Sequence, residues 1–333
     1  MKKKFVGLMV VFLAITSILG ACGSKADSKG TMEVLTLNEV AHSIFYAPLY
    51  VAMEEGYFAE EGIDLKLVTG FGADKTMTAL ISGDAQIGYM GPEASIYAYL
   101  EGANDPVVNF AQGTQRAGNF LVARKSDFQW DDLKGKVILG GRAGGMPEMV
   151  FEYILKKKGI NPKTDVMIDQ SIDFGSTAAA FSGGKGDFTV EFEPAATALE
   201  KEQAGTVVAS CGVESGFVPY TAFGAKKSYI QTHPETIQRF VMAVQKGMDY
   251  VNSHDASAIA KIIAPQFKEQ DSDTLTTIVQ RYQEQKTWKE DLVFEKESFE
   301  LLQDILESAG ELKERVEYSE LVDTEFAQNA KKE

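Results

Sequence analysis

Few residues in this sequence have the types and spacing that catalysis or tight metal binding usually requires. The chain has three histidines, His42, His233 and His254, and the last two fall in a carboxyl-terminal region with helical spacing of apolar residues. That distribution does not indicate a histidine-based metal site. Neither a GxSxG nucleophile motif nor an HExxH zinc motif is present. We therefore expect no catalytic residues, no metal and no cofactor, but a protein that binds its ligand without transforming it.

Two glycine-rich loops are candidates for contact with a ligand. Gly70–Lys75 and Gly140–Gly145 each lie between a predicted strand and a predicted helix. Glycines at such positions let backbone N–H groups approach a ligand closely. Neither loop has the GxGxxG or GxxxxGKS spacing of nucleotide-binding motifs, so each predicts only a turn suited to an anion or a dipole.

The composition argues against a nucleic-acid partner. Lys and Arg number 33 against 48 Asp and Glu, which gives a net charge of −15. Nucleic-acid binding requires clustered basic side chains. Apart from Cys22 the only cysteine is Cys211, so a mature chain that begins at a lipidated Cys22 cannot form an intramolecular disulfide. Cys211 lies in an apolar run and is predicted to be a small core residue.

The amino end has the pattern of a lipoprotein signal. A basic start, Met1–Lys4, precedes an apolar run of roughly 15 residues that ends in Leu19-Gly20-Ala21-Cys22. A membrane-spanning helix needs about 20 residues, so residues 1–21 are predicted to be a secretory signal peptide. Cys22 would be the lipidated first residue of the mature chain and residues 22–30 a polar tether, which anchors the protein outside the cytoplasmic membrane. The alternative is a plain signal peptide whose cysteine is incidental.

The next residues predict a strand, a polar loop and a helix. Val34–Leu37 has the pattern of a buried strand, and the loop Asn38–Ser43 leads to a helix that begins near Phe45 and ends at Gly56. Ser43 is the predicted N-cap. In an open α/β sheet a ligand binds at the carboxyl end of a strand, against the N–H groups of the next helix. This loop is therefore a candidate wall of a binding site; the alternative is an ordinary strand–helix unit with a polar turn.

An internal repeat predicts two lobes of similar construction. A Gly-Asp pair, a short strand and a proline that starts a helix occur twice, about 100 residues apart, and proline suits a first helical position. The two copies are Gly83-Asp84, Ala85–Met90 and Pro92, then Gly186-Asp187, Phe188–Glu193 and Pro194. The alternative is chance similarity between short segments.

About 310 residues would remain after signal cleavage, enough for two lobes with separate cores. Two apolar segments that end in a basic pair and a serine, Asn119–Ser126 and Thr221–Ser228, are the predicted hinge strands. The predicted lobe 1 comprises residues 31–123 and 220–333, and its helical carboxyl-terminal tail is expected to pack around it. The predicted lobe 2 comprises residues 124–219.

Residues Asn38–Phe58, Glu61–Leu65 and Ser82–Gly88 resemble the amino-terminal lobe of the nitrate/taurine/thiamine-precursor family of ABC-transporter solute-binding lipoproteins. The resemblance extends, with decreasing clarity, to about Phe240. It implies an α/β fold of the periplasmic-binding-protein type II kind, with two lobes, two hinge crossovers and capture of a solute by hinge closure. It also implies a monomer that delivers its solute to the permease and ATPase subunits of an importer.

The wider family contains one enzyme, the thiamine-pyrimidine synthase, which carries a cysteine cluster and consumes one of its own histidines. That cluster is absent here, so the resemblance favours a binding protein over an enzyme on the same scaffold.

The family's ligand loops imply which residues line the pocket. Glu191 and Glu193 are the sharpest predictions, because a carboxylate there would accept hydrogen bonds from a solute. The candidates in lobe 1 are Asn38, Glu39, His42, Ser43, Phe45, Asp74, Lys75, Gly91, Glu93, Thr114, Gln115 and Arg116. The candidates from lobe 2 and its return are Arg142, Gly144, Gly145, Met146, Phe174, Gly175, Ser176, Glu191, Phe192, Glu193, Pro219 and Tyr220.

Two classes of solute remain open. An anion such as a sulfonate, taurine or nitrate would need helix amino termini together with Arg116, Lys75 or Arg142. A heterocycle such as a thiamine-pyrimidine precursor would need aromatic faces, which Phe45, Tyr46, Phe174, Phe192 and Tyr220 could supply, and a carboxylate. The predicted carboxylates slightly favour a neutral, cationic or zwitterionic solute with an aromatic or apolar part.

Overall fold

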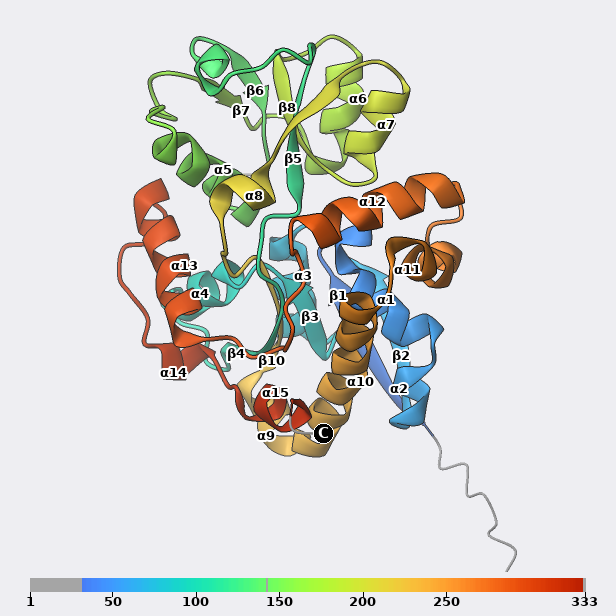
Figure 1. Cartoon of the computed structure of the whole chain (residues 1–333). Coiled ribbons are helices and arrows are strands. Elements are labelled where there is room, and N and C mark those ends of the chain that lie inside the picture. The colour runs from blue at the N-terminus through green and yellow to red at the C-terminus, as the bar shows by residue number, and fades with distance from the viewer. Residues whose placement is uncertain (1–31, 142, 332–333) are drawn as a thin grey trace, which may run out of the picture. The chain divides into compact units, whose positions relative to one another are not determined.

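The computed structural model describes residues 32–141 and 143–331 (Figure 1). The predicted signal peptide, residues 1–21, the tether, residues 22–30, and Cys22 lie outside the described residues, as does Arg142. Within the described ranges, no helix combines the length and the apolar composition that crossing a membrane requires.

Lobe 1 is built on a mixed five-stranded sheet in the order β2-β1-β3-β10-β4. The strands are β1 (Glu33–Glu39), β2 (Ile63–Thr69), β3 (Ile87–Met90), β4 (Val107–Thr114) and β10 (Thr221–Lys226). β1 is parallel to β2 and β3, whereas β10 runs antiparallel to β3 and β4. Leu35 and Leu37 are fully buried but Val34 is 61% exposed, so the alternation of β1 buries one face and not the whole predicted run.

Lobe 2 repeats this plan in a second five-stranded sheet, ordered β7-β6-β8-β5-β9. The strands are β5 (Asn119–Ala123), β6 (Val137–Leu139), β7 (Met167–Asp169), β8 (Phe188–Phe192) and β9 (Thr206–Ser210). In each sheet one strand, β10 or β5, runs antiparallel to both of its neighbours. The predicted α/β fold with two similar lobes is therefore confirmed.

The chain enters lobe 2 earlier than the sequence analysis placed it. β5 pairs with β8 and β9, although residues up to 123 were assigned to lobe 1. β10, the other predicted hinge strand, belongs to the sheet of lobe 1. The two segments have the same apolar pattern, and their own residues do not show which sheet each one joins.

The crossovers between the sheets are short and lie side by side. One spans residues 115–118 and the other residues 216–220. The Val218 N–H donates to the Gln115 carbonyl at 2.9 Å, and the Tyr220 N–H donates to the Thr114 carbonyl at 3.3 Å. A later segment joins them, because the Gln115 N–H donates to the Thr287 carbonyl at 2.9 Å. The two crossovers and the segment around Thr287 are thus hydrogen-bonded to one another between the two sheets.

Helices flank both sheets and begin at the predicted signals. Ser43 Oγ accepts the Phe45 N–H, which starts the 3₁₀ turn η1, and Pro92 and Pro194 precede α4 and α7. In lobe 1 the helical elements are η1 (Ile44–Tyr46), α1 (Ala47–Glu54), α2 (Tyr57–Glu60), α3 (Ala73–Ser82) and α4 (Glu93–Leu100). In lobe 2 they are η2 (Trp130–Leu133), α5 (Met146–Lys157), η3 (Phe174–Ser176), α6 (Thr177–Ser182), α7 (Ala195–Lys201) and α8 (Cys211–Ser215).

The carboxyl-terminal tail is helical, as predicted. Its elements are α9 (Lys227–Thr232), α10 (Pro234–Ser253), α11 (Ala256–Ile263), η4 (Ala264–Gln266), α12 (Ser272–Glu284), α13 (Lys296–Ala309), α14 (Tyr318–Leu321) and α15 (Glu325–Ala330). The predicted apolar face of α10, including Phe240 and Val244, is buried, and α10 packs against α1 of lobe 1.

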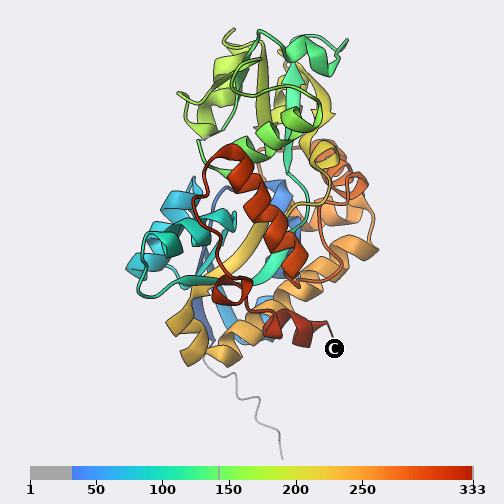
Figure 2. The same cartoon turned by 90° about the vertical axis from the view of Figure 1, so that its left-hand side faces the viewer.

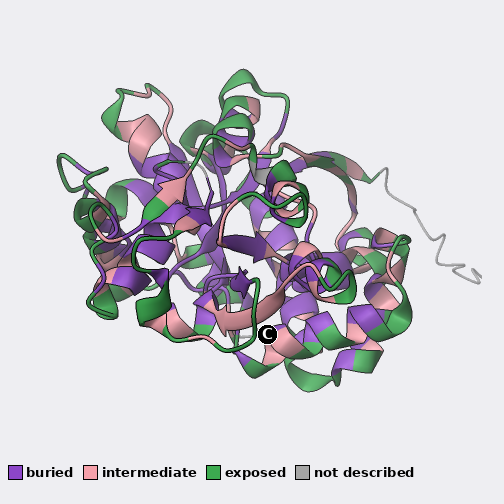
Figure 3. Ribbon diagram, turned by 90° about the horizontal axis from the view of Figure 1, so that it is seen from above, coloured by how far each residue is buried: buried purple, intermediate pink, exposed green. Residues whose placement is uncertain are grey.

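The tail does not pack around lobe 1 alone. α13 packs against α5 of lobe 2, as Figure 2 shows from the side, and Lys156 Nζ on α5 donates to the Ser308 carbonyl at 2.5 Å. The spacing of apolar residues in α13 predicts which face of the helix is buried, but it does not predict the lobe against which that face packs. Figure 3 shows that the buried residues follow the strands and the inner faces of the helices in both lobes.

Candidate functional site

The loops at the strand ends of the two lobes meet directly. Ser43 Oγ of lobe 1 donates to the Glu193 carbonyl of lobe 2 at 2.8 Å. The Met146 N–H of lobe 2 donates to Glu93 Oε1 of lobe 1 at 3.3 Å, and Tyr97 Oη donates to the Gly144 carbonyl at 3.1 Å. The structure therefore brings together two sets of predicted site residues, one from each lobe.

Three aromatic side chains form the centre of this junction. The ring centroids of Phe45 and Phe192 are 5.8 Å apart, those of Phe45 and Tyr220 5.7 Å, and those of Phe192 and Tyr220 6.2 Å. Phe45 follows the first loop of lobe 1, Phe192 ends β8, and Tyr220 ends a crossover. We call these three residues the aromatic cluster. All three were predicted from the sequence.

The tail supports the aromatic cluster from lobe 1. The Trp288 indole N–H donates to the Phe45 carbonyl at 2.9 Å, and the Tyr282 ring lies 5.5 Å from the Phe45 ring. Tyr282 Oη donates to the Gly118 carbonyl at 2.9 Å. A Cβ on Gly118 would lie 2.5 Å from Phe45 ring carbons, so a glycine is needed at this crossover. Sequence reasoning missed Tyr282 and Trp288, which carry no motif and lie more than 230 residues from Phe45.

Beside the aromatic cluster lie buried polar atoms without a hydrogen-bond partner among the described residues. They are the Tyr220 hydroxyl and both side-chain polar atoms of Asn119, and Asn119 is fully buried. Asn119 is paired with Phe192 across β5 and β8, so the two side chains share one face of the sheet. Burial raises the pKa of Tyr220 well above its ordinary value. An unsatisfied buried polar group costs about 1–3 kcal/mol, which a bound solute could recover.

Asn119 was not predicted as a site residue. Its position at the start of a predicted hinge strand was the only available signal, because nothing in the strand pattern shows which residue faces the junction.

Glu93 is the acidic group that reaches across the junction. It is 1% exposed, begins α4, and accepts the N–H of Met146, the first residue of α5. A Cβ on Gly91 would collide with the Glu93 carboxylate, so a larger residue there would displace this side chain. The predicted residues Gly91, Glu93, Gly144, Gly145 and Met146 thus come together where the two helices begin.

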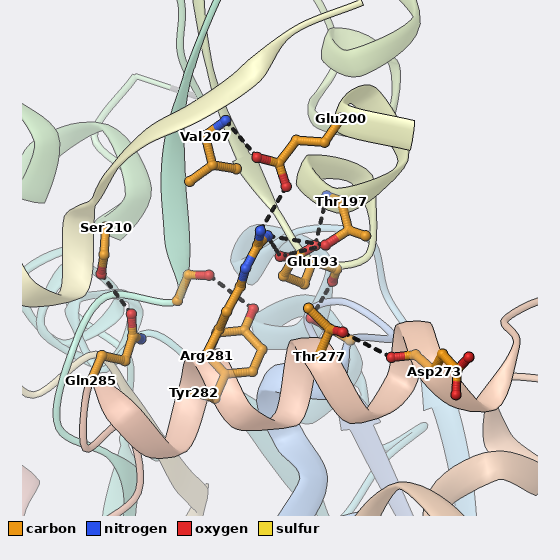
Figure 4. Close-up of polar contacts among 12 residues, drawn as sticks. Glu193, Thr197, Glu200, Val207, Ser210, Asp273, Thr277, Arg281, Tyr282 and Gln285 are labelled. Atoms are coloured by element: carbon orange, nitrogen blue, oxygen red, sulfur yellow. Dashed lines mark hydrogen bonds and ion pairs between the residues drawn. The ribbon is translucent and has the colours of Figure 1, made fainter. Parts of the chain in front are cut away.

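The carboxylate of Glu193 is engaged elsewhere. It accepts the Thr197 N–H and Thr197 Oγ1, both at 2.9 Å, and lies 2.7 Å from Arg281 of α12 (Figure 4). These contacts provide an acceptor for a free N–H group in the first turn of α7 and connect α12 to lobe 2. Only the backbone carbonyl of Glu193 reaches across to Ser43, so the side chain holds the fold rather than facing the aromatic cluster.

Glu191 precedes Phe192 in β8, so the two side chains point to opposite faces of the sheet. Thr189 Oγ1 donates to Glu191 at 2.5 Å. The pKa of Glu191 is raised to about 7, because the effect of burial exceeds that of the hydrogen bonds from Thr189 and Thr177, which lower the pKa. Thr177 begins α6, directly after the predicted site residues Gly175 and Ser176, which are exposed. Glu191 is therefore near the η3 turn and away from the aromatic cluster.

Asn38 and Glu39, which are buried, and His42, which is partly exposed, make hydrogen bonds inside lobe 1. Glu39 accepts hydrogen bonds from His42 Nδ1 at 2.8 Å, Tyr50 Oη at 2.7 Å and Thr69 Oγ1 at 2.9 Å. His42 Nε2 lies 2.9 Å from the Gln266 carbonyl, and Asn38 Oδ1 accepts from Thr76 Oγ1 at 2.7 Å. The hydrogen bond to Glu39 raises the pKa of His42.

Three further candidates hold the crossovers. Thr114 Oγ1 lies 2.6 Å from Thr221 Oγ1, and Gln115 Nε2 donates to the Lys286 carbonyl at 3.1 Å. Arg116 donates to the Gly212 carbonyl at 2.9 Å and stacks over Phe217 at 4.2 Å from the ring centroid. Burial lowers the pKa of Arg116.

The remaining candidates are not in the aromatic cluster. Asp74 and Lys75 are exposed on α3, whereas Pro219, next to Tyr220, is buried. Arg142 and the side chain of Phe174 lie outside the described residues.

Residues 44–258 match the family model described as NMT1/THI5 like. This match covers more than half of the chain. The chain belongs to the NMT1/THI5-like family. YtlA of Bacillus subtilis (strain 168), which carries the name of a binding protein, is 45% identical over 317 residues, or 95% of this chain and 94% of YtlA. The family resemblance seen in the sequence is thereby confirmed.

Other similarities show the fold and the range of the family. The alkanesulfonate-binding protein SsuA from Xanthomonas axonopodis pv. citri, bound to MOPS, superposes with a TM-score of 0.72 at 16% identity, covering 87% of this chain and 98% of SsuA. This likeness supports the periplasmic-binding-protein type II fold. The 4-amino-5-hydroxymethyl-2-methylpyrimidine phosphate synthase of Aspergillus parasiticus is 24% identical over 232 residues, 66% of each chain. The similarities therefore include both binding proteins and an enzyme.

Proposed function

We propose that this protein is the extracytoplasmic solute-binding component of an ABC importer, and that it holds a small organic solute between its two lobes. The observation that carries the proposal is the set of unpartnered polar atoms of Tyr220 and Asn119, buried beside the aromatic cluster where the lobes meet. Membership of a family that includes binding proteins supports it.

Capture would proceed by rotation of the lobes about the crossovers. Residues 115–118 and 216–220 are short, and the strand-end loops of the two lobes are joined by single hydrogen bonds, to which the tail adds contacts such as the ion pair between Arg281 and Glu193. Such contacts can break and form again as a hinge opens and closes. A solute that contacts residues of both lobes stabilises the closed arrangement by its differential affinity.

The aromatic cluster favours a solute with a flat apolar part. Phe45 and Tyr220 are buried and Phe192 is partly exposed; their rings offer an aromatic surface, and a few polar groups beside them set the orientation of a ligand. A heterocycle, such as a pyrimidine of the thiamine-precursor kind, fits this combination better than a sulfonate or nitrate.

A thermal-shift screen tests the proposal. The purified mature protein would be tested against pyrimidines, flavins, amines, amino acids, sulfonates and nitrate. At a concentration one hundred times its dissociation constant, a true ligand stabilises the folded state by about 2.7 kcal/mol, which raises the melting temperature by several degrees. Calorimetry should then give one site per chain. Failure of every class to shift the melting temperature would contradict the proposal.

The enzyme hypothesis is tested with the same ligand. The similarity to the pyrimidine phosphate synthase of Aspergillus parasiticus motivates this test. We expect the solute to be recovered unchanged, in stoichiometric amount, after long incubation and denaturation of the protein. Consumption of the solute, measured by mass spectrometry of the small-molecule fraction, would favour the enzyme instead.

The lipid anchor is a separate part of the proposal. Processing at Cys22 should leave a mature chain that carries diacylglycerol and partitions into detergent. The Cys22→Ser protein should carry no lipid, whether or not its signal peptide is cleaved. Intact-protein mass spectrometry distinguishes the two. An unlipidated wild-type protein would identify the amino end as a plain signal peptide.

A further inference from the structure

Two buried carboxyl groups lie next to each other on α5. Glu148 and Glu152 are four residues apart on this helix, a spacing that makes side chains neighbours, and we call them the carboxyl pair. They are 7% and 8% exposed. Glu148 Oε2 accepts the Gly144 N–H at 3.3 Å, whereas Glu152 Oε2 is buried without a hydrogen-bond partner among the described residues, 3.5 Å from Lys156 Nζ. When two carboxyl groups share a buried site, one of them holds its proton more tightly.

Glu311 brings a third carboxylate to this pair from the opposite lobe. It follows Gly310, which ends α13, and Glu311 Oε2 lies 3.2 Å from the position that a Cβ on Gly144 would occupy. α13 packs against α14 as well as α5, and α14 packs against β4, so this part of the tail is attached to lobe 1 (Figure 2). Tyr97 of lobe 1 also donates to the Gly144 carbonyl. The carboxyl pair therefore lies where lobe 2 contacts lobe 1.

The other charges around the carboxyl pair come from α4, α5 and the segment that follows α5. Lys156 of α5 donates to the Ser308 carbonyl of α13 at 2.5 Å, and Lys163 Nζ lies 3.8 Å from the position of a Cβ on Gly310. Both lysines are close to the carboxyl end of α13, where the helix dipole favours cations. Glu93 of α4 is buried and accepts the N–H at the start of α5. The carboxylates thus gather at the amino-terminal half of α5 and the cations at the end of α13.

The proton affinity of the carboxyl pair depends on this contact between the lobes. Burial, followed by the charge of Glu152, raises the pKa of Glu148 to about 7; Glu311 acts in the same direction, and the hydrogen bond from Gly144 opposes it. Opening of the lobes would move Glu311 away and admit water, so the pKa of Glu148 should be lower in the open arrangement. The arrangement with the higher pKa is favoured by protonation. Its advantage is complete below the pKa of the open arrangement and is lost as the pH rises through about 7.

On the basis of the proposed function, we propose that the carboxyl pair makes closure of the two lobes depend on a proton: the protonated pair allows α13 and Glu311 to pack on α5, and loss of the proton drives them apart. A solute held between the lobes, whatever its chemical class, would then be captured more tightly on the acidic side of neutrality and released more readily on the alkaline side.

The proton itself is the probe, so the test needs no identified solute. Spin labels at Lys75→Cys in lobe 1 and Lys185→Cys in lobe 2, both exposed positions, would report the distance between the lobes by double electron–electron resonance. The exported protein would carry Cys22→Ser, because the other cysteine, Cys211, is buried. We expect the ratio of the short-distance to the long-distance population to fall at least about threefold between about pH 5.5 and about pH 8.5.

Three substitutions assign this change to the contact. Glu148→Gln keeps the size of the side chain but cannot titrate, so the ratio should stay constant across the range. Glu311→Gln, at an exposed position, should leave the fold intact and raise the short-distance population at about pH 8.5 at least about twofold, because it removes a repelling charge. Glu314→Gln removes the same charge from an exposed position three residues further along the tail and should behave like the wild type.

The outcomes are separate from those that test the proposed function. A ratio that does not change with pH in the wild type, or that changes equally in Glu148→Gln, would overturn the proton-dependent closure. So would abolition of the change by Glu191→Gln, because Glu191 is the other carboxyl group whose pKa is raised to about 7. If Glu148→Gln does not fold, as judged by circular dichroism, equal behaviour of Glu311→Gln and Glu314→Gln overturns the inference instead. Each of these results leaves the thermal-shift screen for solutes unaffected.

Discussion

The guanidinium of Arg281 on α12 lies 2.7 Å from Oε1 of Glu193, a fully buried carboxylate at the end of β8 in lobe 2. Its second nitrogen lies 2.6 Å from Oε2 of Glu200 on α7 (Figure 4). α12 itself packs against α11 and η1 of lobe 1. One side chain of the carboxyl-terminal tail therefore connects the two lobes beside the junction.

Arg281→Met should weaken both the fold and solute retention. The substitution leaves Glu193 buried with one fewer donor, which costs about 1–3 kcal/mol in the free energy of unfolding. Because the lost contact joins the lobes in their present arrangement, the solute should also dissociate faster, by about tenfold. Urea denaturation and stopped-flow dissociation measure the two effects.

Arg315→Met is the matched control. Arg315 pairs with Glu300, Asp304 and Glu307 of α13, which are partly or fully exposed, so its loss should cost no more than about 1 kcal/mol. Equal effects of the two substitutions on solute dissociation would mean that Arg281 does not hold the lobes together.

Glu193→Ala should act mainly on stability. The carboxylate accepts two hydrogen bonds from Thr197 in the first turn of α7 as well as the Arg281 ion pair, and loss of a helix-capping acceptor costs about 0.5–2 kcal/mol before the unpaired arginine is counted. We expect a lower free energy of unfolding in urea. A variant with wild-type stability but tenfold weaker solute binding would restore Glu193 as a ligand-binding carboxylate.

This role of Glu193 shows where sequence reasoning succeeded and where it stopped. The strand and the helix start at Pro194 were predicted from local signals, which are apolar runs, turn glycines and prolines. The proximity of this segment to the other lobe was implied by the family resemblance. Alternation along β8 also places Glu191 and Phe192 on opposite faces, and Glu193 follows the end of the strand. Which face meets the junction depends on packing against α12, whose partner residue Arg281 is 88 positions away.

Asn119 is a residue of the candidate site that the sequence did not predict, whereas the Glu193 side chain was predicted to be in the site and does not face the aromatic cluster. The segment of Asn119 was predicted as a hinge strand, yet the register with β8 decides that its amide lies on the same face of the sheet as Phe192. Register between distant strands is not specified by either strand alone. The aromatic members of the candidate site were nominated because their positions match the family's ligand loops.

Tyr220→Phe separates recognition from packing. The ring contacts with Phe45 and Phe192 remain, while a buried hydroxyl without a partner among the described residues is removed. We expect the unliganded protein to be as stable as the wild type or more stable by up to about 1 kcal/mol. Solute binding should weaken at least tenfold. Tyr220→Ala, in contrast, should destabilise the fold by about 3–5 kcal/mol because it creates a cavity.

A Tyr220→Phe protein that binds the solute like the wild type would show that the hydroxyl does not contact it. Calorimetry on the folded variant, with its melting temperature measured in the absence of solute, decides the point.

His42 should make stability depend on pH. Its two ring nitrogens face acceptors, the Glu39 carboxylate and the Gln266 carbonyl, an arrangement that suits the doubly protonated ring, and the hydrogen bond to Glu39 raises its pKa above 6.5. Glu269 acts in the same direction, whereas burial opposes it. A raised pKa in the folded state means that this contribution is fully present below pH 6.5 and is lost as the pH rises through the folded value.

His42→Gln keeps a side chain that can bond to Glu39 but cannot titrate. We expect the wild-type protein to exceed this variant in free energy of unfolding by the largest margin near pH 5.5, and the margin to shrink towards pH 8.5. Burial raises the pKa of Glu148 and Glu191 to about 7, but both titrate in the two proteins and cancel in the difference. Urea denaturation across this range measures the margin, and a margin that grows with pH would show that His42 is neutral in the folded protein.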